Sequence, residues 1–263
     1  MNTATGPALD GRGIVVTRPQ QQCAALVRMI EGAGARALLF PAVEIRDTDR
    51  LAGLDAAIDR LHEYRIAIFI SPNAAERALR RILARRAWPP ALAAAAIGPA
   101  GAAALAARGV AGVTVPARHF DSEGLLDTPL LRSVAGQRVV IFRGNGGREL
   151  LATVLRERGA AVDVVECYRR ECPAADAAPL LAAWSRGQVD AVTVTSSEGL
   201  RNLFAMLGPA GAAVLRGTPL FVPHPRIAAV ARDLGCAAVI ECAAGDSGLM
   251  AALQAHFKAM NPV

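Results

Sequence analysis

Six short polar turns hold the residues best suited to chemistry, and each follows an apolar run. The turns are rich in serine, glycine and arginine, and they cover residues 17–19, 71–73, 98–99, 143–148, 196–198 and 223–226. Nearly all of them lead into the N-terminus of a predicted helix, where free backbone amides and the helix dipole bind anionic oxygens. This pattern indicates a site for a polycarboxylate or phosphate ligand.

The serines in these turns have a second interpretation, because serine is a common N-cap that satisfies the free amides of its own helix. For Ser122 and Ser247, which head two other predicted helices, capping is the better explanation. Ser71 and the pair Ser196 and Ser197 lie at strand ends that match across an internal repeat. For these serines ligand contact and capping both stay open.

Tyr168 is the one polar aromatic residue that stands out. It is one of two tyrosines, and it lies between Cys167 and Arg169 on a predicted connecting segment. Its phenol can donate a hydrogen bond or a proton to a ligand, or it can pack the segment against a domain. The other tyrosine, Tyr64, precedes a predicted strand, and we expect it to be structural.

Several site classes are excluded by spacing. A G-x-G-x-x-G motif starting at Gly144 would need glycine where Glu149 stands, and no G-K-[ST], G-x-S-x-G or H-E-x-x-H occurs. The five cysteines never have C-x-x-C spacing, and the four histidines are scattered. The sequence therefore predicts neither cofactor nor metal, and it favours a reaction that depends on folding and orienting the substrate.

Alternating strands and helices position the turns. The expected strands are residues 13–17, 36–40, 66–70, 93–97 and 112–115, then 138–142, 161–165, 191–195, 220–222 and 238–240, with helices such as 198–207 between them. Near-continuous apolar strands that alternate with helices predict parallel sheets covered on both faces. Ligands of such sheets bind beyond the carboxyl ends of the strands, where the polar turns lie.

The chain also repeats itself at an offset of 125 residues. Residues 14–18 return as 139–143, and 66–71 return as 191–196. Two copies of one α/β unit predict two similar domains, each with about five strands in a flavodoxin-like sheet. A cleft at the interface of two domains is the usual place for a small-molecule site.

Two partitions of the chain fit this repeat. The extended segments 41–46 and 166–170 occupy equivalent positions, and their pairing would form a two-stranded hinge. The first domain would then be discontinuous, with residues 1–41 and 172–263, the second would be 46–165, and 42–45 and 166–171 would be the hinge strands. The alternative is two consecutive halves divided near residue 135.

The bulk composition bounds the partners. The net charge of +6 suits an anionic partner, but the arginines are dispersed and the aromatic residues, at 4%, are too sparse to stack nucleic-acid bases. We find no candidate transmembrane helix, and the polar N-terminal residues 1–13 do not have the pattern of a signal peptide. We therefore expect a cytoplasmic protein that binds neither membrane nor nucleic acid.

Seven motifs in order resemble those of uroporphyrinogen-III synthases, and the resemblance covers essentially the whole chain. They are V-T-R-P at 16–19, I-S-P-N-A at 70–74, I-G-P-A at 97–100, S-E-G-L-L at 122–126, F-R-G-N-G-G-R-E at 142–149, E-C-Y-R-R at 166–170 and T-S-S-E at 195–198. The resemblance implies two flavodoxin-like domains joined by a two-stranded β-ladder, and hence the discontinuous partition.

The same resemblance implies the reaction. Hydroxymethylbilane, a linear tetrapyrrole with acetate and propionate groups, loses its terminal hydroxyl as water and closes through a spiro intermediate that inverts the last pyrrole ring. The product is uroporphyrinogen III, and no cofactor or metal takes part. A transient hand-over from hydroxymethylbilane synthase is a possible partnership, and a monomer is the default.

Site residues follow from matching the motifs. A hinge tyrosine is the favoured catalytic group of the family, and Tyr168 occupies that place. The expected substrate-binding residues are Arg18, Ser71, Asn73, Gly98, Arg143, Gly144, Arg148, Ser196, Ser197 and His224. His224 departs from the small polar residues common at its turn.

Two rival functions remain. A ligand sensor could use the same fold without catalysis, although such sensors usually carry an additional domain for which 263 residues leave no room. A nucleic-acid-binding protein is suggested by the charge alone, and salt-dependent DNA binding would support it.

Overall fold

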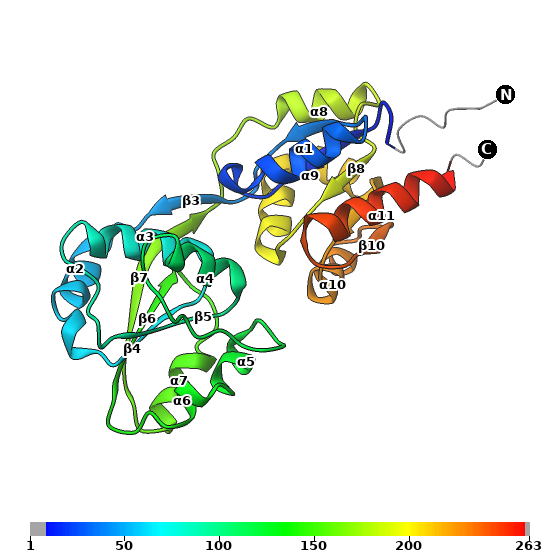
Figure 1. The fold of residues 1–263 in the computed structure, drawn as a ribbon. Helices are drawn as coiled ribbons and strands as arrows, with labels where there is room; N and C mark the ends of the chain where they lie inside the picture. The colour runs from blue at the N-terminus through cyan, green and yellow to red at the C-terminus, as the bar shows by residue number, and fades with distance from the viewer. Residues whose placement is uncertain (1–8, 261–263) are drawn as a thin grey trace. The chain divides into compact units, whose positions relative to one another are not determined.

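The computed structural model describes residues 9–260, which form two compact units (Figure 1). Unit 1 combines the residues up to Glu44 with those from Glu171 onward, and unit 2 is Ile45–Arg170. Residues 1–8 and 261–263, which the predicted first domain includes, lie outside the described residues. The chain thus begins in unit 1, crosses into unit 2 and returns.

Unit 1 is built on one five-stranded sheet. Its strands are β1 (Gly13–Val16), β2 (Arg36–Leu39), β8 (Ala191–Thr193), β9 (Leu220–Val222) and β10 (Val239–Glu241). They lie in the order β2-β1-β8-β9-β10, and every neighbouring pair is parallel. Numbered along the chain within this unit, the order is 2-1-3-4-5, which confirms the predicted flavodoxin-like sheet.

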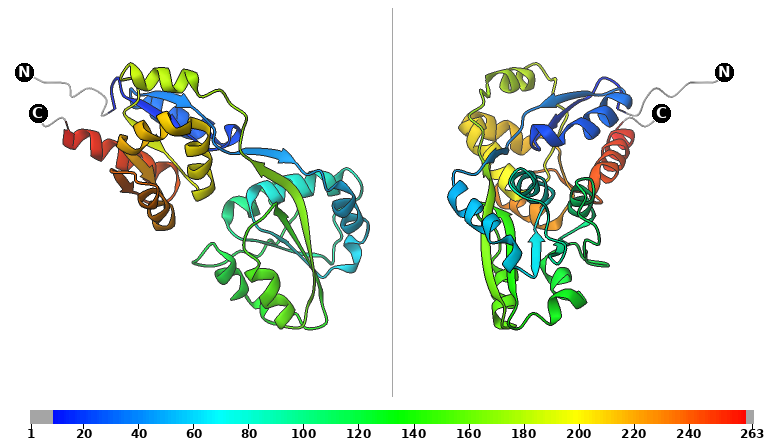
Figure 2. Two further views of the ribbon diagram at one scale, coloured as in Figure 1. Left: turned by 180° about the vertical axis from the view of Figure 1, so that it is seen from behind. Right: turned by 60° about the vertical axis from the view of Figure 1, so that its left-hand side comes forward.

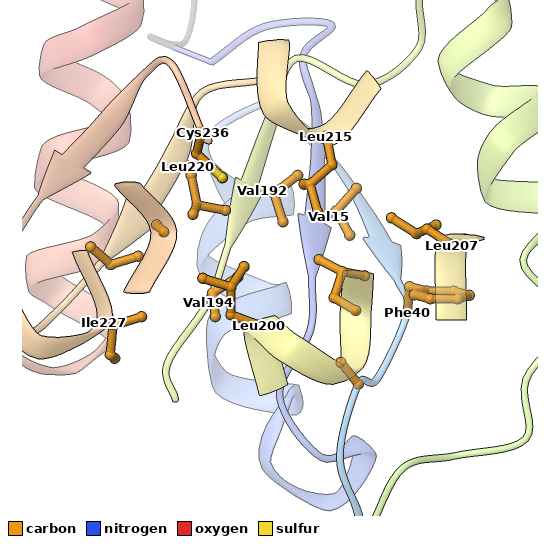
Figure 3. Close-up of a cluster of buried hydrophobic side chains, with 14 of the residues drawn as sticks. Val15, Phe40, Val192, Val194, Leu200, Leu207, Leu215, Leu220, Ile227 and Cys236 are labelled. Carbon is orange, nitrogen blue, oxygen red and sulfur yellow. The ribbon is translucent and has the colours of Figure 1, made fainter. Parts of the chain in front are cut away.

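Helices cover both faces of this sheet because each strand is apolar on both sides. Val15 and Val192 point to one face, where they pack against α8 (Ala178–Ser185), α9 (Ser197–Gly217) and α10 (Pro225–Asp233) (Figure 3). Ile14 and Val16 point to the other face, which α1 (Ala24–Gly32) and α11 (Gly245–Met260) cover. Because successive side chains of a strand point to opposite faces of the sheet, one continuous apolar run contributes to two cores.

Helix α9 extends beyond the predicted helix 198–207. Gly208 has a φ of 64°, a left-handed conformation that glycine adopts without strain, and Pro209 follows it. Proline is tolerated at the start of a helical segment, where its missing N–H has no partner to lose. The glycine and proline therefore make a kink, and the helix continues to Gly217.

Unit 2 holds the second five-stranded sheet, in the order β3-β7-β6-β4-β5. Its strands are β3 (Glu44–Asp47), β4 (Ile66–Phe69), β5 (Ala93–Ala96), β6 (Arg138–Gly144) and β7 (Ala161–Glu171). The pairs β4–β5, β4–β6 and β6–β7 are parallel. Its helices are α2 (Leu51–Asp59), α3 (Pro72–Leu83), α4 (Pro99–Ala106), α5 (Ser122–Leu126), α6 (Pro129–Arg132) and α7 (Leu150–Glu157).

The helices of unit 2 also lie on both sides of its sheet (Figure 2). Ile66, Ile68, Val139 and Ile141 form one face of the sheet and pack against α5, α6 and α7. Helices α3 and α4 contact each other on the opposite side. The turns after β4, β5 and β6 follow the carboxyl ends of these parallel strands.

The predicted strand over residues 112–115 is wrong. One isolated bridge, between Thr114 and Ala95 of β5, is all that forms there. Gly112 has a φ of 65°, and Pro116 has no N–H to donate to a ladder, so the extended stretch is too short for a strand.

The sequence repeat and the two units do not coincide. At the offset of 125 residues, β1 corresponds to β6, β4 corresponds to β8, and the bridge residue Thr114 corresponds to Val239 of β10. Strands of the first copy therefore lie in both units, and so do strands of the second copy. With this correspondence the sheet of unit 2 also has the order 2-1-3-4-5, assembled as β7-β6-β4-β5-Thr114, with β3 added at its edge.

The segments that pass between the units are β3 and the end of β7. These two strands are neighbours in the sheet of unit 2. The separate extended segment expected at 166–170 is continuous with the strand expected at 161–165, because β7 runs unbroken from Ala161 to Glu171. A register shift between Arg143 and Gly144 of β6 lets the ladder continue as far as Tyr168.

Candidate functional site

The expected site residues of unit 2 lie at the carboxyl ends of its parallel strands. Ser71 and Asn73 follow β4, Gly98 follows β5, and Gly144 ends β6. Because β4, β5 and β6 are parallel, these residues share one edge of the sheet. The N-termini of α3 and α4 lie at the same edge, where the helix dipoles favour negative charge.

Tyr168 is hydrogen-bonded to Ser71 at this edge. The phenol oxygen lies 3.1 Å from Ser71 Oγ, and either atom can be the donor. The amide N–H of Ala74 donates to the same Ser71 Oγ at 3.1 Å, so Ser71 is the N-cap of α3. Tyr168 is only 3% exposed, whereas Ser71 is half-buried. The phenol is therefore enclosed, and the serine hydroxyl is its more accessible neighbour.

Gly144 makes room for the tyrosine ring. It pairs with Tyr168 across the β6–β7 ladder. A Cβ atom added at Gly144 would lie 2.7 Å from Tyr168 Cζ and 3.1 Å from its hydroxyl oxygen. Only glycine at this position leaves the ring where it is, because contacts that short are strongly repulsive. Gly144 was predicted to contact the substrate. The need for space beside the Tyr168 ring is a second, structural reason for a glycine here.

Asn145 is hydrogen-bonded to the backbone that follows Tyr168, and it was not among the site residues expected from the sequence. Its Oδ1 accepts a hydrogen bond from the amide of Arg170 at 2.6 Å, and its Nδ2 donates to the carbonyl of Arg170 at 3.1 Å. Its own amide donates to the carbonyl of Tyr168 at 3.2 Å. An asparagine directly after a strand and between glycines was the available signal, since asparagine often pairs with nearby backbone.

Arg143 stabilises the turn that follows β6. Its guanidinium donates to Glu149 at 2.6 Å and to the carbonyl of Gly146, and the residue is 6% exposed. From the sequence we expected Arg143 to bind substrate carboxylates, and in the structure two of its five N–H groups donate within the turn. A cavity of 390 Å³ beside it is lined by equal numbers of basic and acidic side chains, including Arg50 and Glu166, which does not suit a polyanion.

Arg148 is the accessible cation of the same turn. It is paired with Glu123 at the start of α5, and both side chains are half-exposed. The Glu123 carboxylate raises the pKa of Arg148, and Arg148 lowers the pKa of Glu123. Exposed pairs of this kind are weak, so a substrate carboxylate can replace Glu123 at little cost.

The expected residues of unit 1 also follow parallel strands. Ser196 and Ser197 come after β8, Arg18 comes after β1, and His224 comes after β9. Arg18 donates to Asp246, near the start of α11, at 2.6 Å. His224 is the N-cap of α10, and its Nδ1 accepts from the amide of Arg226 at 3.0 Å. Histidine thus performs at this turn the capping role usual for small polar residues.

The neighbouring serines Ser196 and Ser197 differ, because only Ser196 caps a helix. Ser196 caps α9, and its Oγ accepts from the amide of Gly199 at 2.9 Å. The Oγ of the next residue, Ser197, is buried and has no hydrogen-bond partner among the described residues. The capping expected of Ser122 and Ser247 is wrong. Asp121 caps α5, and Ser247 lies inside the first turn of α11.

Replacing the two neighbouring serines separates the two interpretations. We expect Ser196→Ala to lower the free energy of unfolding by about 1 kcal/mol, because it removes a cap. Ser197→Ala removes no hydrogen bond of the folded protein, so we expect a change below about 0.5 kcal/mol. Thermal unfolding followed by circular dichroism measures both. Equal destabilisation by the two variants would contradict this assignment.

Two kinds of feature are absent from the part of the chain that the structure describes. Residues 9–260 contain no group of three or more His, Cys, Asp or Glu side chains placed to hold a metal ion. Within the same residues, no helix is long and apolar enough to cross a membrane.

The chain matches one family model and several curated proteins. The model described as uroporphyrinogen-III synthase HemD matches residues 24–250. The uroporphyrinogen-III synthase of Salmonella typhimurium is 35% identical over 225 residues, which cover 84% of this chain and 91% of that protein. The uroporphyrinogen-III synthase of Escherichia coli is 34% identical over 224 residues, with the same two shares.

Two solved structures have a similar fold. A mutant uroporphyrinogen III synthase from the extremely thermophilic bacterium Thermus thermophilus matches with a TM-score of 0.62 and 19% identity, over 95% of this chain and 98% of that one. The uroporphyrinogen-III synthetase of Helicobacter pylori matches with a TM-score of 0.58 and 15% identity, over 93% of this chain and 99% of that one. At these identities the likeness establishes the fold.

Proposed function

Because the chain belongs to the uroporphyrinogen-III synthase family, we propose that it cyclises hydroxymethylbilane to uroporphyrinogen III. The reaction releases water and inverts the terminal pyrrole ring through a spiro intermediate, as a step of tetrapyrrole biosynthesis. The observation that supports a catalytic site at the strand ends of unit 2 is the hydrogen bond between Tyr168 and Ser71 at the N-terminus of α3.

Loss of the terminal hydroxyl is the step that needs a proton. The pyrrole nitrogen of the substrate pushes electrons toward the adjacent carbon, and the carbon–oxygen bond breaks as the hydroxyl takes up a proton and leaves as water. Mild acid assistance therefore suffices, and no metal or organic cofactor is required. The later loss of a proton from the inverted pyrrole ring restores the donor, so that atoms and charges balance over the cycle.

Tyr168 and Ser71 can supply that proton together. A serine hydroxyl has one donor and two acceptor sites. Ser71 Oγ can accept from both Ala74 and Tyr168, and it can then donate its own proton to the leaving hydroxyl. The phenolate that remains on Tyr168 lies near the N-terminus of α3, where the helix dipole stabilises negative charge. We assign the role of general acid to this pair.

The carboxylates of the substrate need separate partners. In unit 2 we assign them to the N-termini of α3 and α4, around Asn73 and Gly98, where the helix dipoles favour negative charge, and to Arg148. In unit 1 we assign them to the turns that contain Arg18, Ser196, Ser197 and His224. Arg18 would exchange Asp246 for a substrate carboxylate, and Ser197 has a buried Oγ that a ligand could satisfy.

The cellular setting is also a proposal. We place the enzyme in the cytoplasm as a monomer that receives hydroxymethylbilane from the synthase that makes it. A test in cells is complementation of an Escherichia coli strain that lacks its own uroporphyrinogen-III synthase. We expect the wild-type chain to restore tetrapyrrole synthesis. A well-expressed chain that fails to restore it would contradict the proposed activity.

A further inference from the structure

Phe120 is an exposed aromatic side chain in a protein that buries nearly all the others. It is 54% exposed, whereas the other six phenylalanines are buried or half-buried. Both tyrosines are buried, and the two tryptophans are buried or half-buried. A single exposed apolar residue needs no explanation by itself. The location of Phe120 and its charged neighbours provide an explanation for its exposure.

Phe120 lies at the same strand-end edge as Ser71 and Tyr168. It packs on Gly98, the N-cap of α4, since a Cβ added at Gly98 would lie 3.3 Å from Phe120 Cβ and 3.6 Å from its Cγ. The first turn of α4 in turn approaches Ser71, because a Cβ at Gly101 would lie 3.9 Å from the Ser71 carbonyl carbon. One side of the aromatic side chain therefore meets the backbone of the edge, and the rest is exposed beyond it.

The segment that carries Phe120 suits an acidic aromatic ligand. Arg118 and His119 precede Phe120 directly, and both are exposed. The acidic residue that follows directly, Asp121, is engaged within the protein by capping α5. The segment thus presents an aromatic ring and basic groups together, and the carboxylate next to the ring caps a helix.

The same segment has room to adjust. A cavity of 340 Å³ lies beside it, lined by residues from Thr114 to His119 and by the start of the next helices, including Thr128 and Pro129. Side chains that border a cavity are not held by close packing on that side. Arg118 and His119, which line this cavity, can therefore shift toward a ligand without displacing core residues.

We infer that Phe120 stacks on a pyrrole ring of the substrate, while Arg118 or His119 contacts a carboxylate on that ring. This inference rests on the proposed function, because the ligand it names is the tetrapyrrole. An aromatic side chain offers a flat, polarisable surface to a flat pyrrole, and such contacts change affinity by about two- to tenfold. Phe120 would be a binding residue that helps orient one ring at the strand ends, and it would have no part in proton transfer.

Three substitutions test the contact. We expect Phe120→Ala to raise KM by about two- to tenfold and to leave kcat within about twofold, because the contact is made before and during the reaction alike. Phe120→Tyr keeps the ring and should resemble the wild type, whereas Phe120→Leu keeps only an apolar side chain and should resemble the alanine variant. Thermal unfolding should be nearly unchanged in all three, because the side chain is exposed.

Leu83→Ala is a matched control, because Leu83 is an exposed apolar residue at the far end of α3 in the same unit. It should leave KM unchanged. A Phe120→Ala variant with the KM of the wild type would overturn the inference. A Phe120→Leu variant with the same KM as Phe120→Tyr would also overturn it, because an apolar side chain without an aromatic ring would then be sufficient.

Binding of uroporphyrin III, followed by porphyrin fluorescence, separates this inference from the proposed function. If the wild type forms no isomer III yet binds the porphyrin, weaker binding by Phe120→Ala alone still supports the contact, and equal binding overturns it. A wild type that neither reacts nor binds overturns both. An active wild type with an unaffected alanine variant overturns the stacking contact alone.

Discussion

Replacing Tyr168 by phenylalanine is expected to lower kcat by about a hundredfold or more, the usual contribution of a positioned general acid. The substitution removes one hydroxyl and the hydrogen bond to Ser71 and keeps the buried ring. Loss of a hydrogen bond between two hydroxyls costs about 1 kcal/mol, so the protein should remain folded. Steady-state kinetics with hydroxymethylbilane, together with thermal unfolding, measures both effects.

Tyr64→Phe is the matched control. Tyr64 is the other buried tyrosine of unit 2, and its hydroxyl donates to Asp163, with Arg60 and Arg138 nearby. Burial, followed by the hydrogen bond to Asp163, raises the pKa of Tyr64 to about 12. We expect this variant to lose stability and to keep its turnover. If Tyr168→Phe keeps wild-type turnover, Tyr168 has no part in the mechanism.

Gly144→Ala should damage the site without removing any functional group. The added Cβ would lie 2.7 Å from Tyr168 Cζ, and both residues belong to paired strands that cannot separate easily. The ring must therefore move away from Ser71. We expect a loss of about 1–3 kcal/mol in the free energy of unfolding from overpacking. We also expect a fall in kcat comparable to that of Tyr168→Phe, measured in the same assay.

Gly53→Ala controls for the loss of a glycine. Gly53 lies inside α2 of the same unit, and an added Cβ there meets no atom within 4 Å. Alanine in a helix is favoured over glycine by about 0.5–1 kcal/mol, so this variant should be slightly stabilised and fully active. Wild-type kcat in Gly144→Ala would mean that the placement of the Tyr168 ring does not limit the reaction.

The sequence was sufficient for the sheets because most of their strands are short apolar runs between helices. The runs that include Val15 and Val192 predicted parallel strands with both faces buried, and the structure confirms this. The strand expected at 112–115 failed because a glycine and a proline limit it to one bridge. Local composition therefore predicted the sheets well, and it failed where backbone conformation decided the outcome.

The repeat was harder to interpret correctly. It predicted two similar α/β units, and two sheets with one strand order are present. Because β1 and β6 correspond, as do β4 and β8, each copy contributes strands to both sheets. Similarity along a chain reports which segments share an ancestor or a role, but the pairing of distant strands depends on contacts that the sequence pattern does not contain.

The sequence predicted a site at the strand ends but not how its residues contact one another. Serines and glycines at strand ends indicated this edge, and Tyr168, which the sequence singled out, contacts Ser71 there. The burial of Arg143 and the pairing of Asn145 with Arg170 could not be predicted, since both depend on the folded turn. Residue type and spacing indicated which groups are available, whereas their partners followed only from the structure.

The most direct test of the account is the isomer composition of the product. Purified protein would be mixed with freshly prepared hydroxymethylbilane, and the oxidised products would be separated into uroporphyrin I and uroporphyrin III. We predict a large excess of isomer III over a protein-free sample, in which unassisted closure gives isomer I. Isomer I alone from well-folded protein would contradict the account and would favour a ligand sensor on the same fold.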